Sequence, residues 1–339
     1  MPSPNATVFP DPSIWDVVII GGGLAGLSAA VYLGRALRKT LLLDSGKSLA
    51  VWEPDVQNYL GFPEGIDGKK LLSLGRQQAL KYGARCQDGE VVGAHREQSL
   101  FCFETREALF RSRCALLATG LIHLPPEIPE VKECLGHSMF FCKDCDAYRV
   151  RGQRIVILGS NNEAVDYALA ILSFSPIVVL APNGVQPRWS SQHADWIREY
   201  QIPVYSERIV EVEHDRGFLQ SLTFADGQCV AADCLFTTRG DRYHNKLAQS
   251  LGAALDESGE VKVDAEMRTS VPGLYAAGCV TPANCQMIIA AGNGATAAQT
   301  INRDLFEESL RTHTLRRFRE MQIASEPTEP EEISAPAKQ

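Results

Sequence analysis

The chain has 339 residues, of which 45% are hydrophobic and 22% are charged, a composition typical of a globular protein with room for two domains. Its net charge of −8 at pH 7 argues against a nucleic-acid partner. Residues 1–12 lack the basic and apolar regions of a secretion signal, and no apolar run approaches the ~20 residues that cross a bilayer, so we expect a cytoplasmic protein with no membrane partner.

The first pattern along the chain is a strand, a glycine loop and a helix. Residues 15–20 form a continuous apolar strand, residues 21–26 match the dinucleotide-binding sequence Gly-x-Gly-x-x-Gly, and residues 27–37 have helical spacing. A second strand ends in Asp44, about 20 residues past the loop, where ribose recognition requires an acid. The combination predicts a βαβ unit that holds a pyrophosphate at the helix N-terminus.

A second unit of the same kind follows. A glycine- and proline-rich stretch precedes a helix that we expect to end near Tyr82, and a buried strand at residues 114–120 ends at a crossover. Residues 154–158 open another strand, loop and helix, and residues 234–240 lead back to the first domain. A strand near residue 276 then precedes a helix over residues 286–304.

These elements predict an α/β protein with two Rossmann-like (three-layer ββα) nucleotide-binding domains, the second inserted into the first. We expect an N-terminal arm at residues 1–13 and a discontinuous domain formed by residues 14–120 and 241–321. Residues 121–240 form the inserted domain. A tail at residues 322–339, rich in proline and glutamate, is expected to be disordered.

A Cys-x-x-Cys-Asp sequence at residues 142–146 lies just upstream of the second unit. Two intervening residues that lead into a helix bring the Cα atoms within disulfide range and lower the thiolate pKa, so we expect a redox-active dithiol. A structural zinc site would lack half of its ligands, and no metal site is predicted. The cysteines without framework spacing are predicted to be buried small hydrophobes: Cys86, Cys102, Cys114, Cys134, Cys229 and Cys234.

From about Trp15 to Leu305 the order of motifs resembles the low-molecular-weight thioredoxin reductases. The most specific parts are the Gly-Phe-Pro-Glu-Gly-Ile-Asp-Gly sequence at residues 61–68, the Cys-x-x-Cys-Asp sequence at 142–146 and the Gly-Leu-Tyr-Ala-Ala-Gly segment at 273–278. The resemblance implies FAD in the discontinuous domain and an inserted domain that resembles an NADPH domain and carries the redox-active cysteines. It also implies a homodimer.

The resemblance assigns roles to individual residues. Cys145 is the sulfur next to the flavin, Cys142 attacks the partner disulfide, and Asp146 is the acid that protonates the leaving thiolate. Asp44 accepts from the adenosine ribose, Lys47 assists a phosphate, and Gln286 stabilises charge on the reduced flavin. The residues expected to bind FAD are Gly21, Gly23, Leu24, Ala25, Gly26, Asp44, Lys47, Asn58, Thr119, Gly120, Gly278, Cys279 and Gln286.

The chain departs from the family pattern in both nucleotide sites. Cys279 replaces the usual aspartate at the ribityl contact, and we expect it and Cys285 to be two packed thiols rather than a redox pair. In the second loop Asn161 replaces the glycine that admits the pyrophosphate, and only Arg188 stands where NADPH-dependent members carry a basic run. NADPH binding is therefore doubtful. Residues 311–319 are expected to form a solvated terminal helix, with a cap over the flavin as the alternative.

The leading hypothesis is an FAD-dependent disulfide oxidoreductase on an atypical branch that does not use NADPH. Electrons would pass between flavin and the Cys142/Cys145 dithiol and reach a thioredoxin-like protein, with ferredoxin as a conceivable donor. The alternatives are a dithiol oxidase that uses dioxygen on a small molecule, a conventional NADPH-thioredoxin reductase, and a redox-silent flavin-binding module.

Overall fold

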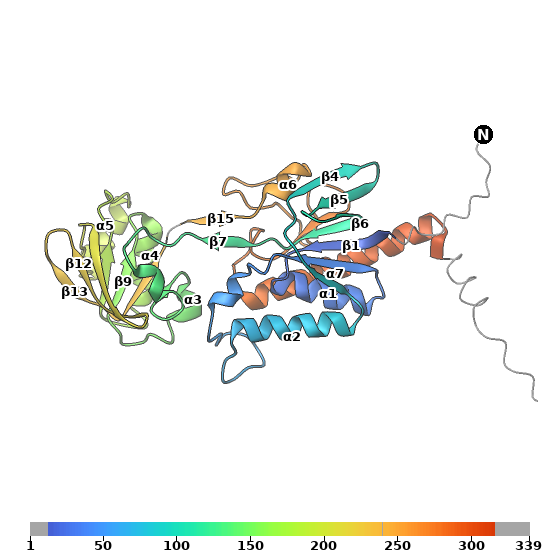
Figure 1. Ribbon diagram of the computed structural model, residues 1–339. Helices are drawn as coiled ribbons and strands as arrows, with labels where there is room; N and C mark the ends of the chain where they lie inside the picture. The colour runs from blue at the N-terminus through green and yellow to red at the C-terminus, as the bar shows by residue number, and fades with distance from the viewer. Residues whose placement is uncertain (1–12, 239, 316–339) are drawn as a thin grey trace, which may run out of the picture.

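The computed structural model describes residues 13–238 and 240–315, and it shows two domains side by side, connected by two antiparallel strands (Figure 1). These strands are β7 (Leu121–His123) and β15 (Asp241–Tyr243), in which Ile122 lies opposite Arg242. The architecture confirms the predicted fold class of two Rossmann-like α/β domains, the second inserted into the first. No helix among the described residues is long and apolar enough to cross a membrane.

The first domain is built on a mixed sheet. Its strands lie in the order β3-β2-β1-β6-β5-β4, with β16 also paired to β6. The strands β1, β2, β3, β6 and β16 are parallel, whereas β4 and β5 extend the sheet as an antiparallel hairpin. The strand bounds are β1 (Ile14–Ile20), β2 (Thr40–Asp44), β3 (Arg85–Asp88), β4 (Gly93–Glu97), β5 (Leu100–Glu104), β6 (Leu109–Leu117) and β16 (Leu274–Ala276).

Helices cover this sheet on one face. The helices α1 (Leu24–Arg35), α2 (Gly68–Lys81) and α7 (Met287–Arg311) lie below it in Figure 1, and the short α6 (Lys246–Ser250) lies on the opposite side. Successive side chains of β1 point to opposite faces of the sheet, so the strand contacts the helices on both sides. Val17 and Ile19 pack in the core with α1 and α7, and Val18 and Ile20 pack in the core that includes α6.

Small residues let α1 and α7 approach closely at their N-terminal ends. A side chain on Gly294 of α7 would overlap the carbonyl oxygen of Ala25 in α1. A Cβ on Gly278, which follows β16 with φ of +77°, would lie 2.9 Å from the Cβ of Ala25. The turn after β16 and the two helix starts are therefore packed backbone against backbone.

The second domain has three layers. The parallel sheet β10-β9-β14-β8 is covered on one face by helices and on the other by an antiparallel meander, β11-β12-β13. The alternating side chains of β9 serve the two cores, Ile157 with the helices and Val156 with the meander. The element bounds are β8 (Met139–Phe140), α3 (Lys143–Asp146), β9 (Ile155–Leu158), α4 (Asn162–Ile171), β10 (Val178–Ala181), α5 (Ser191–Glu199), β11 (Ile209–Asp215), β12 (Phe218–Phe224), β13 (Cys229–Ala231) and β14 (Cys234–Thr237). Two 3-10 helices complete the described chain, η1 (Leu49–Trp52) and η2 (Val131–Cys134).

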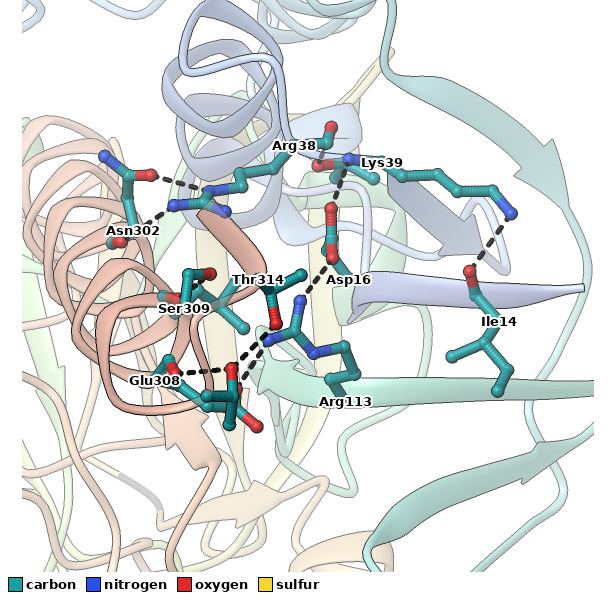
Figure 2. Close-up of polar contacts among 12 residues, drawn as sticks. Ile14, Asp16, Arg38, Lys39, Arg113, Asn302, Glu308, Ser309 and Thr314 are labelled. Atoms are coloured by element: carbon teal, nitrogen blue, oxygen red, sulfur yellow. Dashed lines mark hydrogen bonds and ion pairs between the residues drawn. The ribbon is translucent and has the colours of Figure 1, made fainter. Parts of the chain in front are cut away.

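The helix α7 extends further than the sequence pattern predicts, to Arg311 rather than residue 304. Polar contacts fix this extension to the sheet (Figure 2). Arg113 of β6 lies 2.6 Å from Glu308 in this extension and 2.8 Å from Asp16 of β1. Just before the extension, Asn302 of α7 accepts from Arg38 at 2.7 Å. Ion pairing along the last turns replaces the apolar periodicity on which the prediction depended.

Other boundaries and burial predictions also need correction. Helix α1 begins at Leu24, three residues earlier than expected, because the glycine loop leads directly into it, and it ends before Leu37, whose φ is +57°. Two of the predicted buried cysteines are not buried: Cys229 is exposed on the edge strand β13, and Cys86 is half-buried on the short strand β3. The expected arm over residues 1–12, the tail at 322–339 and residues 316–319 of the terminal helix lie outside the described residues.

Candidate active site

The first glycine loop presents bare backbone to one cavity. A Cβ on Gly21, which has φ of +109°, would overlap the carbonyl oxygen of Ala118, and a Cβ on Gly26 would overlap the carbonyl oxygen of Gly21. Gly23 differs, because only Ser48 Oγ lies near its Cβ position, at 3.4 Å, and no side chain caps the helix at this residue. The uncapped N-terminus of a twelve-residue helix fits a pyrophosphate, as FAD would require.

Asp44 is held in place at the end of β2. Its Oδ1 accepts hydrogen bonds from the backbone N–H of Gly22 at 3.0 Å and of Gly46 at 3.1 Å. Both bonds use the same oxygen, so Oδ2 is left to accept from a ribose hydroxyl, and the carboxylate fits the predicted role. Lys47 lies along the same cavity, with its ammonium 3.1 Å from Glu90.

Cys142 and Cys145 are joined in a disulfide at the start of α3, with their Cα atoms 5.3 Å apart. The sulfur of Cys142 accepts from the backbone N–H of Cys145 at 3.1 Å. Gln286, at the start of α7 in the other domain, lies with its Nε2 3.1 Å from each of the two sulfurs. Its Oε1 accepts from Asn58 Nδ2 at 2.9 Å. The disulfide therefore faces the first domain, where one amide donates to it.

Asp146 directly follows Cys145 in α3, lines the same cavity, and is buried at 7% exposure. Burial, reinforced by the charge of Glu53, raises the pKa of this carboxyl to about 7, and Arg149 opposes the shift from a distance of 3.5 Å. Burial also raises the pKa of Glu53. The side chain therefore holds a proton near neutral pH, as a general acid requires.

One cavity joins these groups, and its lining comes from both domains. Among the residues predicted to bind FAD, Gly26 does not line it, because it packs against the glycine loop from behind. Thr119 donates from Oγ1 to the carbonyl of His244 at 2.7 Å, and Gly120 has φ of +63°. The predicted residues on the lining are Gly21, Gly23, Leu24, Ala25, Asp44, Lys47, Asn58, Thr119, Gly120, Cys142, Cys145, Asp146, Gly278, Cys279 and Gln286.

The prediction of two packed thiols at Cys279 and Cys285 is wrong. The two residues form a second disulfide, with Cα atoms 4.9 Å apart, and both line the same cavity. The turn that follows Gly278 brings the residues together, since Thr281 donates back to the Gly278 carbonyl from its N–H at 2.9 Å and from Oγ1 at 2.7 Å. Cys279 consequently has no thiol to offer a ribityl hydroxyl.

Sequence reasoning missed two residues of the site. Glu53 lies in an irregular segment after η1 with no motif around it, and it affects Asp146 only through the contact between domains. Ser48 lines the cavity beside Gly23. Its hydroxyl caps η1 by accepting from the N–H of Ala50, and a serine before a short helix is the one signal that the sequence offers for it.

The second glycine loop is closed by groups of the chain itself. Asn161 caps α4, with its Oδ1 accepting from the N–H of Ala164 at 3.1 Å. The segment after β10 bonds across the loop: Arg188 donates its backbone N–H to the carbonyl of Ser160 at 2.6 Å, and Ser190 donates its backbone N–H to Asn162 Oδ1 at 2.8 Å.

Comparison with known proteins agrees with this geometry. Residues 15–299 match the family described as pyridine nucleotide-disulphide oxidoreductase. The chain is 30% identical to the thioredoxin reductase of Treponema pallidum (strain Nichols), over 84% of this chain and 95% of the relative. The crystal structure of HlmI superposes with a TM-score of 0.84 at 29% identity, over 92% of this chain and 99% of HlmI. Lactococcus lactis thioredoxin reductase in its FR conformation, also 29% identical, gives a TM-score of 0.57 over 86% of this chain and 99% of that one. The chain therefore belongs to the low-molecular-weight thioredoxin reductases, a family of flavin-dependent disulfide oxidoreductases.

Proposed function

We propose that this enzyme exchanges electrons between FAD and the Cys142–Cys145 pair without NADPH, and that it acts on the disulfide of a thioredoxin-like protein. The observation that carries the proposal is the closed second glycine loop. A one-electron carrier such as ferredoxin is the donor that we favour, because it needs no pyrophosphate site. The family resemblance further supports a cytoplasmic homodimer, which light scattering after size-exclusion chromatography would test.

Three features of the second loop disfavour a dinucleotide. The helix N-terminus, where a pyrophosphate would bind, is capped by the side chain of Asn161. Glu163 follows in the first turn of α4, where burial raises its pKa and the charges of Asp241 and Asp166 raise it further, so this helix start is surrounded by carboxyl groups. The backbone bond between Arg188 and Ser160 would have to break before a nucleotide could pass between these segments. A phosphate at this helix start would be repelled by the nearby carboxylates. Its binding would also break the hydrogen bonds that Asn161 and Arg188 make within the protein.

The residues around the first disulfide are suited to its opening and closure. FAD, when bound, supplies or accepts the two electrons of the disulfide. The amide of Gln286 donates to both sulfurs, and this hydrogen bonding stabilises negative charge on whichever sulfur becomes a thiolate. Cys145 gives its backbone N–H to Cys142, which favours a thiolate at Cys142 in the same way. Asp146, protonated near neutral pH, delivers the proton to the thiolate that leaves.

A second candidate, a dithiol oxidase that uses dioxygen, is favoured by one observation. Cys142 and Cys145 line the cavity and are only half-buried, so a small dithiol could reach the sulfurs without a domain movement. A protein disulfide, by contrast, would require the domains to move about the β7 and β15 connection. The family assignment argues against the third alternative, a redox-silent module.

The test is anaerobic reduction of the FAD-loaded protein, followed by flavin absorbance. We expect no rapid bleaching with NADPH or NADH and rapid bleaching with photoreduced ferredoxin, after which a thioredoxin disulfide should be reduced. Rapid bleaching by NADPH would contradict the proposal and favour a conventional reductase. If instead a small dithiol sustains peroxide formation in air, and a Cys145→Ser variant does not, the oxidase is the correct function.

A further inference from the structure

Cys279 and Cys285 form a disulfide on the wall of the flavin cavity, and both residues precede Gln286, whose amide donates to the first disulfide. Cys279 directly follows Gly278 at the end of the β16 turn, and Cys285 directly precedes Gln286 at the start of α7. The bond therefore joins the end of a central strand to the start of the longest helix. Neither the FAD-binding motif nor the step at Cys142 and Cys145 requires a sulfur at these positions.

Both sulfur-bearing residues are half-buried, and the loop between them is exposed at Pro282 and Asn284. A disulfide that is accessible from solvent or from a cavity is open to attack by a thiolate, whereas buried structural disulfides resist reduction. The first disulfide, Cys142–Cys145, has the same half-buried position on the same cavity. A small dithiol that enters this cavity meets both.

The loop closed by this bond has few other contacts across it. Ala283 donates its backbone N–H to Thr281, and Gln286 donates its own to the carbonyl of Asn284, so these bonds join neighbours within the loop. Anchorage outside the loop comes at its first residues, where Val280 accepts from Val261 at 2.8 Å and Thr281 donates to Gly278. The covalent bond at Cys285 thus adds a cross-link between the start of α7 and the strand end, beside the packing of Gly278 against Ala290, and a short cross-linked loop loses conformational freedom.

We propose that Cys279–Cys285 is a second redox-active disulfide, which a small dithiol opens in the folded protein, and that opening it releases Gln286 from the Cys142–Cys145 pair. A thiolate of the dithiol attacks one sulfur to form a mixed disulfide and expels the other cysteine as a thiolate. The second thiol of the dithiol then displaces the bound cysteine and closes its own disulfide. The dithiol loses two electrons and two protons, and both pass to the cysteine pair.

Opening of the Cys279–Cys285 bond by a dithiol is independent of whether the enzyme uses NADPH. Gln286 connects the two disulfides. Cys285 precedes Gln286 in the chain, and the side-chain amide of Gln286 donates to both sulfurs of the first pair. Loss of the cross-link frees the backbone on the N-terminal side of Gln286. The redox state of the second disulfide then controls how firmly the first is held.

Native alkylation tests the chemical part. The FAD-loaded protein and a Cys142→Ser/Cys145→Ser variant are treated anaerobically with dithiothreitol, alkylated without denaturant and mapped by mass spectrometry. We expect Cys279 and Cys285 to change from unlabelled to fully labelled in both proteins. Exposed Cys229 is the control that should be labelled throughout.

Two results would overturn that part. One is a Cys279–Cys285 bond that stays closed while dithiothreitol opens Cys142–Cys145 in the unmutated protein, which remains decisive even if the serine variant does not fold. The other is labelling that occurs only together with Cys102, which is fully buried and should react only after unfolding.

Hydrogen exchange tests whether opening the Cys279–Cys285 bond frees the backbone that carries Gln286, and the serine variant isolates this bond because it has no first disulfide. On reduction of the Cys142→Ser/Cys145→Ser variant, amides in residues 281–290 should exchange about tenfold faster or more, because the short loop loses its cross-link. A Cys279→Ser/Cys285→Ser variant is the matched control, which should exchange rapidly from the start and show no further change with dithiothreitol. Unchanged exchange in the first variant after its bond has opened would overturn the release of Gln286.

Discussion

The buried carboxyl of Asp146 gives the sharpest test of the site, through an Asp146→Asn substitution. Asparagine has the same shape and cannot ionise. Burial and the charge of Glu53 raise the pKa of Asp146 from 3.8 to about 7 in the folded protein. In the unfolded chain the carboxyl titrates near its ordinary value. Between these two pKa values the folded state binds more protons than the unfolded state, so the free energy of unfolding falls as pH rises.

The size of the effect follows from this pKa difference. The slope is about 1.4 kcal/mol per pH unit. In the unmutated protein, ionisation of Asp146 should therefore lower the free energy of unfolding by about 3 kcal/mol as the pH rises from about 5 to about 8. The loss is complete above the folded pKa. Asp146→Asn removes this pH dependence, so the stability of the variant relative to the unmutated protein should be about 3 kcal/mol greater near pH 8 than near pH 5.

Urea denaturation followed by tryptophan fluorescence at the two pH values measures the difference. The matched control is Asp144→Asn on the same short helix, where the carboxylate is 74% exposed beside Lys143 and should show no such dependence. A gap between Asp146→Asn and the unmutated protein that is the same at both pH values would refute the reasoning. So would an equal effect from Asp144→Asn. For disulfide exchange, Asp146→Asn should lower the rate about 100-fold or more near neutral pH, as loss of a general acid does.

Three further substitutions test the cofactor site, the closed loop and the extended helix. Gly23→Ala should leave the fold intact, because nothing lies closer than 3.4 Å to the new Cβ, but should weaken FAD binding at least about tenfold by fluorescence titration, since the methyl group meets the pyrophosphate. Asn161→Ala should lower the free energy of unfolding by about 1 kcal/mol through the lost helix cap, without gaining NADPH binding by calorimetry. Arg113→Met should lower the unfolding free energy by about 1 to 3 kcal/mol in urea, with a smaller loss at high salt, because Asp16 and Glu308 lose their shared partner.

The fold could be predicted from the sequence because its signals are local. The strand over residues 15–20, the glycine loop and Asp44 all lie within residues 15–44, and the continuous apolar run of the strand predicts that both of its faces are buried. The repeat of this pattern at residues 154–164 was enough to predict the second domain. The end of α7 could not be predicted in this way, because Arg113, the partner of Glu308, lies 195 residues earlier in the chain.

The site could be predicted only where a motif carries it. The Cys-x-x-Cys spacing itself places Cys142 and Cys145 in bonding distance. The pair Cys279 and Cys285 has no such motif, since five intervening residues bring two cysteines together only if the chain turns back, as it does after Gly278. The sequence predicts that Asn161 disfavours a pyrophosphate, and this stays a prediction, but the sequence did not predict that the side chain of Asn161 caps α4.

The acid Asp146 and the Cys142–Cys145 disulfide each depend on a partner across the contact between the domains. Gln286 and Glu53 both belong to the first domain, whereas Cys142, Cys145 and Asp146 belong to the second. In the arrangement seen here, Gln286 donates to the disulfide and the charge of Glu53 helps to keep Asp146 protonated. Movement of the domains about β7 and β15 would take both partners away together. Burial is the larger cause of the raised pKa of Asp146, and loss of the Glu53 charge would lower that pKa, which favours release of the proton when the sulfurs lose their amide donor. Exposure of the dithiol to a partner and delivery of the proton that its chemistry needs would thus be a single event.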